Sequence, residues 1–246
     1  MIVKYILRGL IIGLLYFIAS GLQSDSVLAS EKIEPNSYSI SGFEILEDPT
    51  GIYSFDEISA SDYANQYSDY PGEVISLGIT KSVYWIRFKV VNLGIEEKVA
   101  GKFLQMKNSN IDKIDIYIPA SNDDYIVKKV GVSRPNSNRD IIDNTWVFQL
   151  PKEMNEQKYI YLRLESTSAL RLPIICWNAD SFIADSFLKN LGFGAFYGIL
   201  LAMLIFNLFI YFVLRDKAYL FYVLYIMFMF LYQIQVHGHL KMLIDI

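Results

Sequence analysis

The sequence predicts an all-β domain, a jelly roll or sandwich, that is exported from the cell and followed by α-helical transmembrane segments. Apolar and polar residues alternate with a period of two over most of residues 37–177, as in half-buried strands. A short apolar segment precedes this region, and two long uncharged stretches follow it. The expected organisation is a signal peptide over residues 1–29, a sandwich over 30–185 and two membrane helices within 189–240.

The N-terminus has the pattern of an export signal. Lys4 and Arg8 form a positively charged region, and residues 9–21 supply an apolar core. Small residues at the expected positions predict cleavage after Ala29. The alternative is an uncleaved anchor helix, although the apolar core is short for a full span. In both cases the chain from Ser30 onward is exported.

The sandwich is predicted from five alternating runs. Their apolar positions are Tyr84, Ile86, Phe88 and Val90; Ile114, Ile116 and Ile118; Trp146, Phe148 and Leu150; Ile160, Leu162 and Leu164; and Leu170, Leu172, Ile174 and Cys176. Polar turn signals separate the runs, which favours an antiparallel sandwich or jelly roll. A short helix is also expected over residues 55–64, because Ser54 can act as its N-cap and Glu57 follows three residues later.

Two membrane spans are predicted after Asp185. Residues 191–214 carry no charge and would form a helix about 36 Å long at roughly 1.5 Å per residue, which is enough to cross a bilayer. Arg215 and Lys217 lie in a polar turn, and residues 218–240 form a second uncharged stretch. With the sandwich outside, the positive-inside rule places this turn in the cytoplasm.

The composition argues against several classes of function. Residues 30–188 hold 23 acidic and 16 basic side chains, a net charge of 16 − 23 = −7, so nucleic acid is not an expected partner. Cys176 is the only cysteine and is interpreted as a core residue. The only histidines are His237 and His239, so no enzyme with a histidine relay, no metal site and no cofactor is expected in the sandwich.

Five side chains on the faces opposite the aliphatic rows are candidates for ligand binding: Trp85, Arg87, Tyr117, Tyr161 and Arg163. Aromatic rings beside charged hydrogen-bonding groups suit sugars, whose CH faces stack on a ring while their hydroxyls form hydrogen bonds. The alternative is that these side chains lie under a second layer or loop. For Trp85 both interpretations are kept, whereas for the other four side chains the covered position is favoured.

The first span also contains a helix-packing motif. Gly194, Gly198 and Ala202 are spaced four residues apart, which allows helices to approach closely. Asn207 lies well inside the span, where its amide needs a hydrogen-bond partner. That hydrogen bond could hold helices together structurally or serve as a signalling contact. These features predict a bundle of more than two helices.

The order of these features resembles a known family. The sequence matches its pattern at Leu77-Gly78, Tyr84-Trp85-Ile86-Arg87-Phe88, Asn92, residues 114–117, Tyr161-Leu162-Arg163, Leu172-Pro173, residues 196–200, Asn207-Leu208-Phe209, Arg215-Asp216 and residues 219–222. This pattern resembles the type 2 extracellular domain of bacterial seven-transmembrane receptors with diverse intracellular signalling modules (7TMR-DISM), followed by the start of their membrane bundle. The resemblance implies a jelly-roll sensor related to carbohydrate-binding modules, seven spans, and a cytoplasmic output such as a diguanylate cyclase, histidine kinase or phosphatase. This sequence departs from that pattern because it stops at Ile246 after two spans, which leaves a truncated gene, a partial sequence and a natural short form open.

The expected function is therefore a non-enzymatic receptor in the bacterial inner membrane with its N-terminal domain in the periplasm. Its expected partners are the lipid bilayer and a small-molecule ligand, with a carbohydrate as one candidate; a homodimer is left open. The first alternative is a membrane-tethered carbohydrate-binding or envelope-assembly module without a signalling role. The second is an envelope enzyme, which the lack of histidines in the sandwich disfavours.

Overall fold

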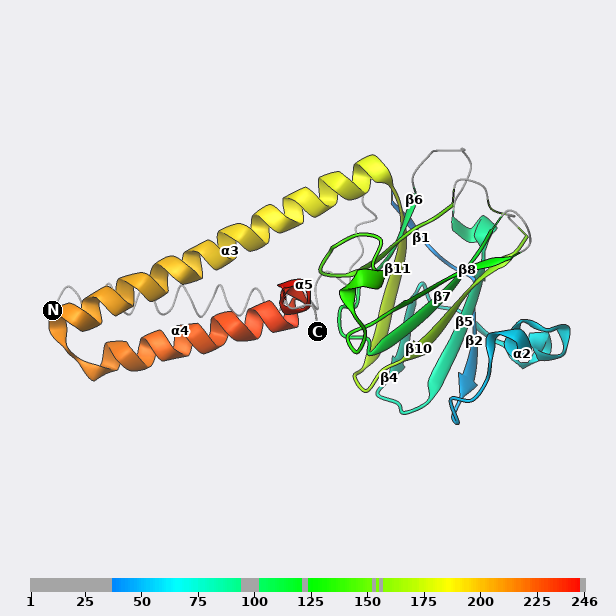
Figure 1. Ribbon diagram of the computed structural model, residues 1–246, viewed down its shortest axis with the longest axis horizontal. Helices are drawn as coiled ribbons and strands as arrows, with labels where there is room; N and C mark the ends of the chain where they lie inside the picture. Colours follow the sequence, from blue (N-terminus) through cyan, green and yellow to red (C-terminus); the bar gives the residue numbers. More distant parts are fainter. Residues whose placement is uncertain (1–36, 94–101, 121–123, 152–153, 155–156, 244–246) are drawn as a thin grey trace. The chain divides into compact units, whose positions relative to one another are not determined.

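The computed structural model describes residues 37–93, 102–120, 124–151, 154 and 157–243. The expected signal peptide and its cleavage site lie outside these residues. Two antiparallel sheets form the β domain, and long helices follow it in the chain (Figure 1). The predicted fold class, a β-sandwich followed by apolar helices, is confirmed.

The first sheet has five described strands, in the order β1-β11-β6-β9, with β4 also paired to β11. Their bounds are β1 Ser37–Ser39, β4 Val74–Gly78, β6 Lys102–Met106, β9 Trp146–Gln149 and β11 Leu170–Asn178. The second sheet has six described strands, in the order β3-β2-β5-β10-β7-β8. Their bounds are β2 Phe43–Asp48, β3 Ser68–Tyr70, β5 Val83–Lys89, β7 Lys113–Pro119, β8 Tyr125–Val130 and β10 Tyr159–Glu165.

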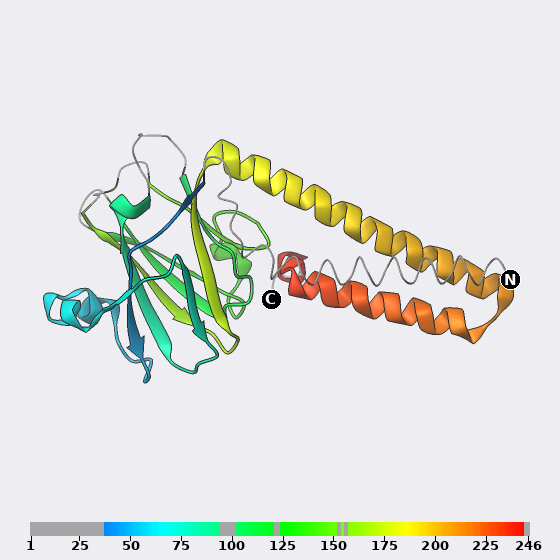
Figure 2. The ribbon, with the colours of Figure 1, turned by 180° about the vertical axis from the view of Figure 1, so that it is seen from behind.

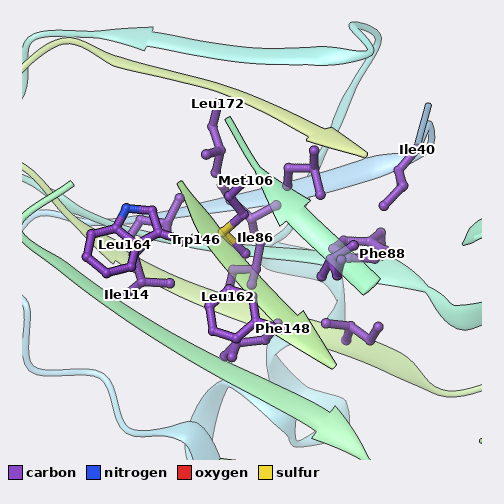
Figure 3. Packing of buried hydrophobic residues seen from close by; sticks show 14 of the residues in the cluster. Ile40, Ile86, Phe88, Met106, Ile114, Trp146, Phe148, Leu162, Leu164 and Leu172 are labelled. Atoms are coloured by element: carbon purple, nitrogen blue, oxygen red, sulfur yellow. The ribbon is translucent and has the colours of Figure 1, made fainter. Parts of the chain in front are cut away.

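The core lies between the two sheets and consists of the predicted alternating rows. Ile86, Phe88, Ile114, Trp146 and Leu162 are among the buried side chains that meet there (Figure 3). All the apolar positions named above belong to this core except Tyr84, which is only partly buried. Cys176 is buried in the core as expected, and its burial raises the pKa of the thiol to about 11.

The predicted short helix forms outside the sandwich, beside β2 (Figures 1 and 2). Helix α2 covers Phe55–Ser59, and Ser54 and Glu57 form the expected capping box. The helix is shorter than predicted because Ala60 has an extended backbone, after which the 3-10 helix η1 covers Ser61–Gln66. Two further 3-10 helices are η2 Val90–Leu93 and η3 Asn136–Asn138.

Two helices are long and apolar enough to cross a membrane, among the residues that the structure describes. Helix α3, Ala179–Leu214, begins directly after β11 and therefore extends well before the predicted span. It ends where Arg215 adopts a left-handed backbone conformation, and Asp216 then caps α4, Lys217–Val236, by accepting a hydrogen bond from the backbone N–H of Ala218. Helix α4 packs against α3 and is followed by the short helix α5, His239–Leu243.

Candidate functional site

The structure brings the five candidate ligand-binding residues together on one face of the six-stranded sheet. Trp85 and Arg87 lie on β5, Tyr117 on β7, and Tyr161 and Arg163 on β10. Arg163 is the cross-strand partner of Trp85, while Tyr161 is the partner of both Arg87 and Tyr117. This proximity follows from β10 pairing with β5 on one side and with β7 on the other.

A second layer covers this face. The side chain of Trp85 is only 1% exposed and packs in a cluster with Leu46, Ile58, Tyr117 and Tyr161. We call residues 53–67 the cover segment, because their apolar and aromatic side chains pack against this cluster; they are Tyr53, Phe55, Ile58, Tyr63 and Tyr67. The candidate side chains therefore point away from the inner core as predicted, but Trp85 does not reach solvent. Its burial under a covering segment is the alternative interpretation given above.

The cover segment is attached through a turn at the end of β2. One carboxylate oxygen of Asp48 accepts hydrogen bonds from the backbone N–H of Thr50 (3.2 Å) and of Gly51 (2.7 Å), and the other from the backbone N–H of Tyr53 (2.9 Å). Gly51 has φ +70°, where a side chain would be strained, and its carbonyl accepts a hydrogen bond from Arg163 (3.3 Å). The turn thereby places the cover segment over the sheet.

Phe55 is the residue of the cover segment that is inserted among the tyrosines. Its ring stacks on Tyr117 with centroids 4.1 Å apart and planes at 4°. The rings of Tyr125 and Tyr161 meet it edge-on, at centroid distances of 5.0 and 5.5 Å. Aromatic side chains from three strands thus enclose one ring on its face and edges.

Arg87 supplies a charged group at this cluster. Its guanidinium forms an ion pair with Glu44 on β2, through Nε at 2.8 Å and Nη2 at 2.5 Å, and Nη2 also donates to the backbone carbonyl of Ala64 in the cover segment at 3.2 Å. It also lies over the rings of Tyr67 (3.8 Å) and Tyr159 (4.7 Å). Burial alone would lower the pKa of Arg87, but the hydrogen bonds and charge of Glu44 outweigh it and the pKa is raised. Arg87 therefore stays charged while buried.

Two polar atoms in this cluster are buried without a hydrogen-bond partner in the described part of the chain. They are the indole Nε1 of Trp85 and the hydroxyl oxygen of Tyr67. Burial raises the pKa of Tyr67, Tyr117 and Tyr161, so these phenols are neutral at physiological pH. The cluster thus combines apolar rings with unused hydrogen-bonding capacity.

The partners of these residues were not predicted from the sequence. They are Glu44, Phe55, Tyr67, Tyr125 and Tyr159. The available signal was the spacing of Tyr53, Phe55, Tyr63 and Tyr67 around an otherwise polar helix, which indicates a segment packed on an aromatic surface.

The helix-packing residues are divided between exposed and buried positions. Gly194, Gly198 and Ala202 are exposed on α3, and within the described part of the chain nothing lies within 4 Å of a Cβ added at either glycine. Asn207 is buried, and its amide donates a hydrogen bond to the carbonyl of Met203 in the same helix at 2.8 Å. Packing of a further helix on the exposed small residues stays a prediction.

Strand β11 and helix α3 are joined without a linker. Trp177 near the end of β11 and Phe103 on β6 both pack against Phe182 in the first turns of α3, with ring centroids 6.5 and 5.2 Å from it. The indole N–H of Trp177 donates a hydrogen bond to the side-chain oxygen of Gln105 on β6 at 2.8 Å. The start of α3 is therefore part of the packing of the five-stranded sheet.

Two loop residues before β9 contact helix α3 and the residue that follows α4. The buried carboxylate of Asp143 pairs with Lys189 on α3 at 3.3 Å. The side-chain amide of Asn144 donates a hydrogen bond to the carbonyl of His237, which follows α4, at 3.1 Å. Within the described residues, no group of three or more His, Cys, Asp or Glu side chains is placed to hold a metal ion.

Comparison with known proteins assigns both parts of the chain. The family model described as 7TMR-DISM extracellular 2 matches residues 41–178, which span nearly the whole sandwich. The model described as 7TM diverse intracellular signalling matches residues 189–245, which include most of α3 and all of α4. No match was found among curated proteins. With an extracellular sandwich and apolar helices matching these two models, the chain belongs to the 7TMR-DISM family of transmembrane signalling receptors.

Proposed function

We propose that this protein is a non-enzymatic receptor of the bacterial inner membrane, in which the periplasmic sandwich binds a small polar ligand and the helices transmit the change to a cytoplasmic output. A carbohydrate is the ligand class that the aromatic and charged side chains around Trp85 suit best. A non-enzymatic role is supported by the sequence, which has no histidine in the sandwich for a nucleophile–base relay.

The observation that carries the proposal is the direct connection of β11 to α3. Phe182 packs with Trp177 and Phe103, so the first turns of the helix belong to the close packing of the sheet. Closely packed interiors transmit small displacements because they leave little free volume to absorb them. A shift of β11 on ligand binding would therefore move α3 rather than be lost in a flexible linker.

A second connection supports the same relay. Asp143 and Asn144 lie close together in one loop of the sandwich, and they contact α3 and the end of α4 respectively. A movement of this loop would change the position of one helix relative to the other. Such a displacement of packed helices is a common element of transmembrane and allosteric switching.

The test measures the spacing of the two helices when a ligand binds. Two cysteines are introduced at exposed positions, by Leu188→Cys on α3 and Tyr232→Cys on α4, and each carries a spin label. The full chain is studied in lipid nanodiscs. Cys176 does not interfere, because it is buried and the pKa of its thiol is raised to about 11. Cellohexaose, maltohexaose and chitohexaose are screened for a shift in melting temperature, and the distance between the labels is then measured with each saccharide that binds.

A receptor requires that a bound saccharide changes the label distance, and that Phe182→Ala removes this change while binding persists. Leu201→Ala, an exposed position on α3 away from the junction, is the control and should leave the change intact. Binding without any change in distance would contradict signalling and favour a tethered binding module. The gene sequence downstream of codon 246 is a second test, since the proposal requires further spans and an output domain in frame.

A further inference from the structure

We propose that the face around Trp85 is a saccharide-binding site that is occupied here by the chain's own cover segment, with the ring of Phe55 in the place of a sugar ring. This inference rests on the proposed function in one respect, because it takes the sandwich as the ligand-binding domain. It adds a defined position for the ligand and a competitor within the same chain.

The shape of the position that Phe55 occupies suits a sugar ring. One ring, Tyr117, lies parallel to Phe55 at a centroid distance of 4.1 Å, and the rings of Tyr125 and Tyr161 border its edge. These three rings come from β7, β8 and β10, whereas Phe55 comes from the separate helix α2. A pyranose ring presents a flat CH face of similar size, which stacks on aromatic rings in the same way.

Buried polar atoms at this face lack hydrogen-bond partners in the described part of the chain. Trp85 on the sheet is 1% exposed, and its Nε1 has no hydrogen-bond partner among the described residues. The hydroxyl of Tyr67, which belongs to the cover segment lying over it, also lacks a partner there. A layer that served only to pack would pay a penalty for each such atom, because a buried donor without an acceptor loses its bond to water. A sugar hydroxyl both accepts and donates, so it can satisfy the indole N–H.

The ion pair of Arg87 and Glu44 offers a charged hydrogen-bond donor to a ligand. Arg87 holds Glu44 through Nε and Nη2, and Nη2 is shared with the carbonyl of Ala64 in the cover segment. When the cover segment leaves, the guanidinium loses its hydrogen bond to Ala64 and its contact with the ring of Tyr67, and it regains a donor that can serve a ligand hydroxyl. The ion pair with Glu44 stays in place and keeps Arg87 oriented.

The cover segment is a thin layer, which makes its displacement feasible. Ile58 is its only fully buried side chain, and most of α2 and η1 is exposed. A ligand must compete with this segment, so its apparent affinity is reduced by the fraction of molecules in which the site is open. Weakening the cover segment should therefore tighten ligand binding, whereas weakening an ordinary packing layer would not.

The test compares saccharide binding by the full chain in lipid nanodiscs, measured by calorimetric titration with cellohexaose, maltohexaose and chitohexaose. Phe55→Ala removes the competing ring, and we expect it to bind at least one of these saccharides at least fivefold more tightly than the unaltered chain. Adding Trp85→Phe to Phe55→Ala removes the indole N–H and should weaken that binding at least fivefold. Leu77→Ala is the control, a partly buried apolar residue on β4 of the other sheet, and should leave the affinity unchanged.

Hydrogen exchange provides an independent measurement on the unaltered chain. Saturation with a saccharide that binds should accelerate amide exchange in residues 53–67 and slow it in β5, β7 and β10. If the Phe55→Ala variant no longer melts cooperatively, the Asp48→Asn variant is used in its place. This substitution loosens the attachment of the cover segment without altering the proposed site, and it too should tighten saccharide binding at least severalfold.

Three outcomes would overturn the proposal: none of the saccharides binds, binding is no tighter after the cover segment is weakened, or binding protects residues 53–67 together with the sheet. These outcomes are distinct from failure of the receptor function. A saccharide that binds as described but leaves the distance between α3 and α4 unchanged would retain the site and remove the signalling role. If a saccharide changes the distance between the helices and this change is unaffected by the Phe55 and Trp85 substitutions, the signalling role is retained and the proposed site is removed.

Discussion

Trp85 occupies an unusual position for an outward-facing strand residue. It points away from the inner core of the sandwich, yet it is 1% exposed because the cover segment lies over it. Its ring contributes packing to a second apolar cluster, while its Nε1 has no hydrogen-bond partner in the described part of the chain. Trp85 is thus important for stability in this structure whether or not it also contacts a ligand.

We expect Trp85→Ala to lower the free energy of unfolding of a fragment comprising residues 30–188, which keeps Phe182 on the sheet, by about 3–5 kcal/mol, as for other buried tryptophans. Thermal and urea denaturation followed by far-UV circular dichroism, which should show a β-rich spectrum, will measure this loss. Ile79→Ala, at an exposed position, is the control and should change the stability by less than about 0.5 kcal/mol. A loss below about 1 kcal/mol for Trp85→Ala would mean that the cover segment does not pack on it in solution.

At the scale of elements, the cover segment depends on one buried carboxylate. Asp48 is fully buried and accepts hydrogen bonds from the backbone of Thr50, Gly51 and Tyr53. Burial alone would raise the pKa of Asp48, but these hydrogen bonds to the charged form outweigh it, and the pKa is lowered from 3.8. The carboxylate therefore stabilises the folded state in its ionised form.

The consequence is a defined pH dependence. Because the folded-state pKa of Asp48 lies below the unfolded value, its contribution to stability is fully present above about pH 5 and is lost as the pH falls through the folded pKa. We expect Asp48→Asn to reduce the stability of the 30–188 fragment by about 1–3 kcal/mol at pH 7 and to flatten its decline below pH 4. Urea denaturation at a series of pH values measures both effects.

Asp69→Asn is the matched control for this experiment, because Asp69 is an exposed carboxylate on the neighbouring strand β3. It should leave both the stability and its pH profile close to those of the unaltered fragment. If Asp48→Asn leaves the loss of stability at low pH unchanged, protonation of Asp48 is not the cause of that loss.

At the scale of the whole molecule, the two helices define how the chain crosses the membrane. Arg215 and Lys217 lie at the turn between α3 and α4, and the family match places the preceding sandwich outside the cell. Positively charged residues remain preferentially on the cytoplasmic side of a bilayer. Helix α3 should therefore run inward and α4 outward.

Reporter fusions test this topology. Alkaline phosphatase, which is active only in the periplasm, should be active when fused after Asp185 and inactive when fused after Lys217. A green fluorescent protein, which folds in the cytoplasm, should give the opposite pattern at the same two positions and thus serves as the control. A cytoplasmic signal at Asp185 would contradict the orientation.

The sequence by itself determined the features that depend on local periodicity and length. Period-two alternation identified the apolar rows that fill the core, from Ile86 to Cys176, because successive side chains of a strand point to opposite faces. The capping box at Ser54 and the apolar stretch ending at Leu214 were likewise predictable, since each depends on residues that are neighbours in the chain.

The tertiary structure decided what lies against the outward faces. Alternation shows that Trp85, Tyr117 and Tyr161 leave the core, but it does not show what stands opposite them. That depends on strand pairing between β5, β10 and β7, and on a turn at Asp48 that brings Phe55 onto Tyr117 from a distant part of the chain. Likewise, only packing of Phe182 on Trp177 joins the first helix to the sheet. Contacts between residues far apart in sequence arise when chain segments meet in space, and no local pattern encodes them.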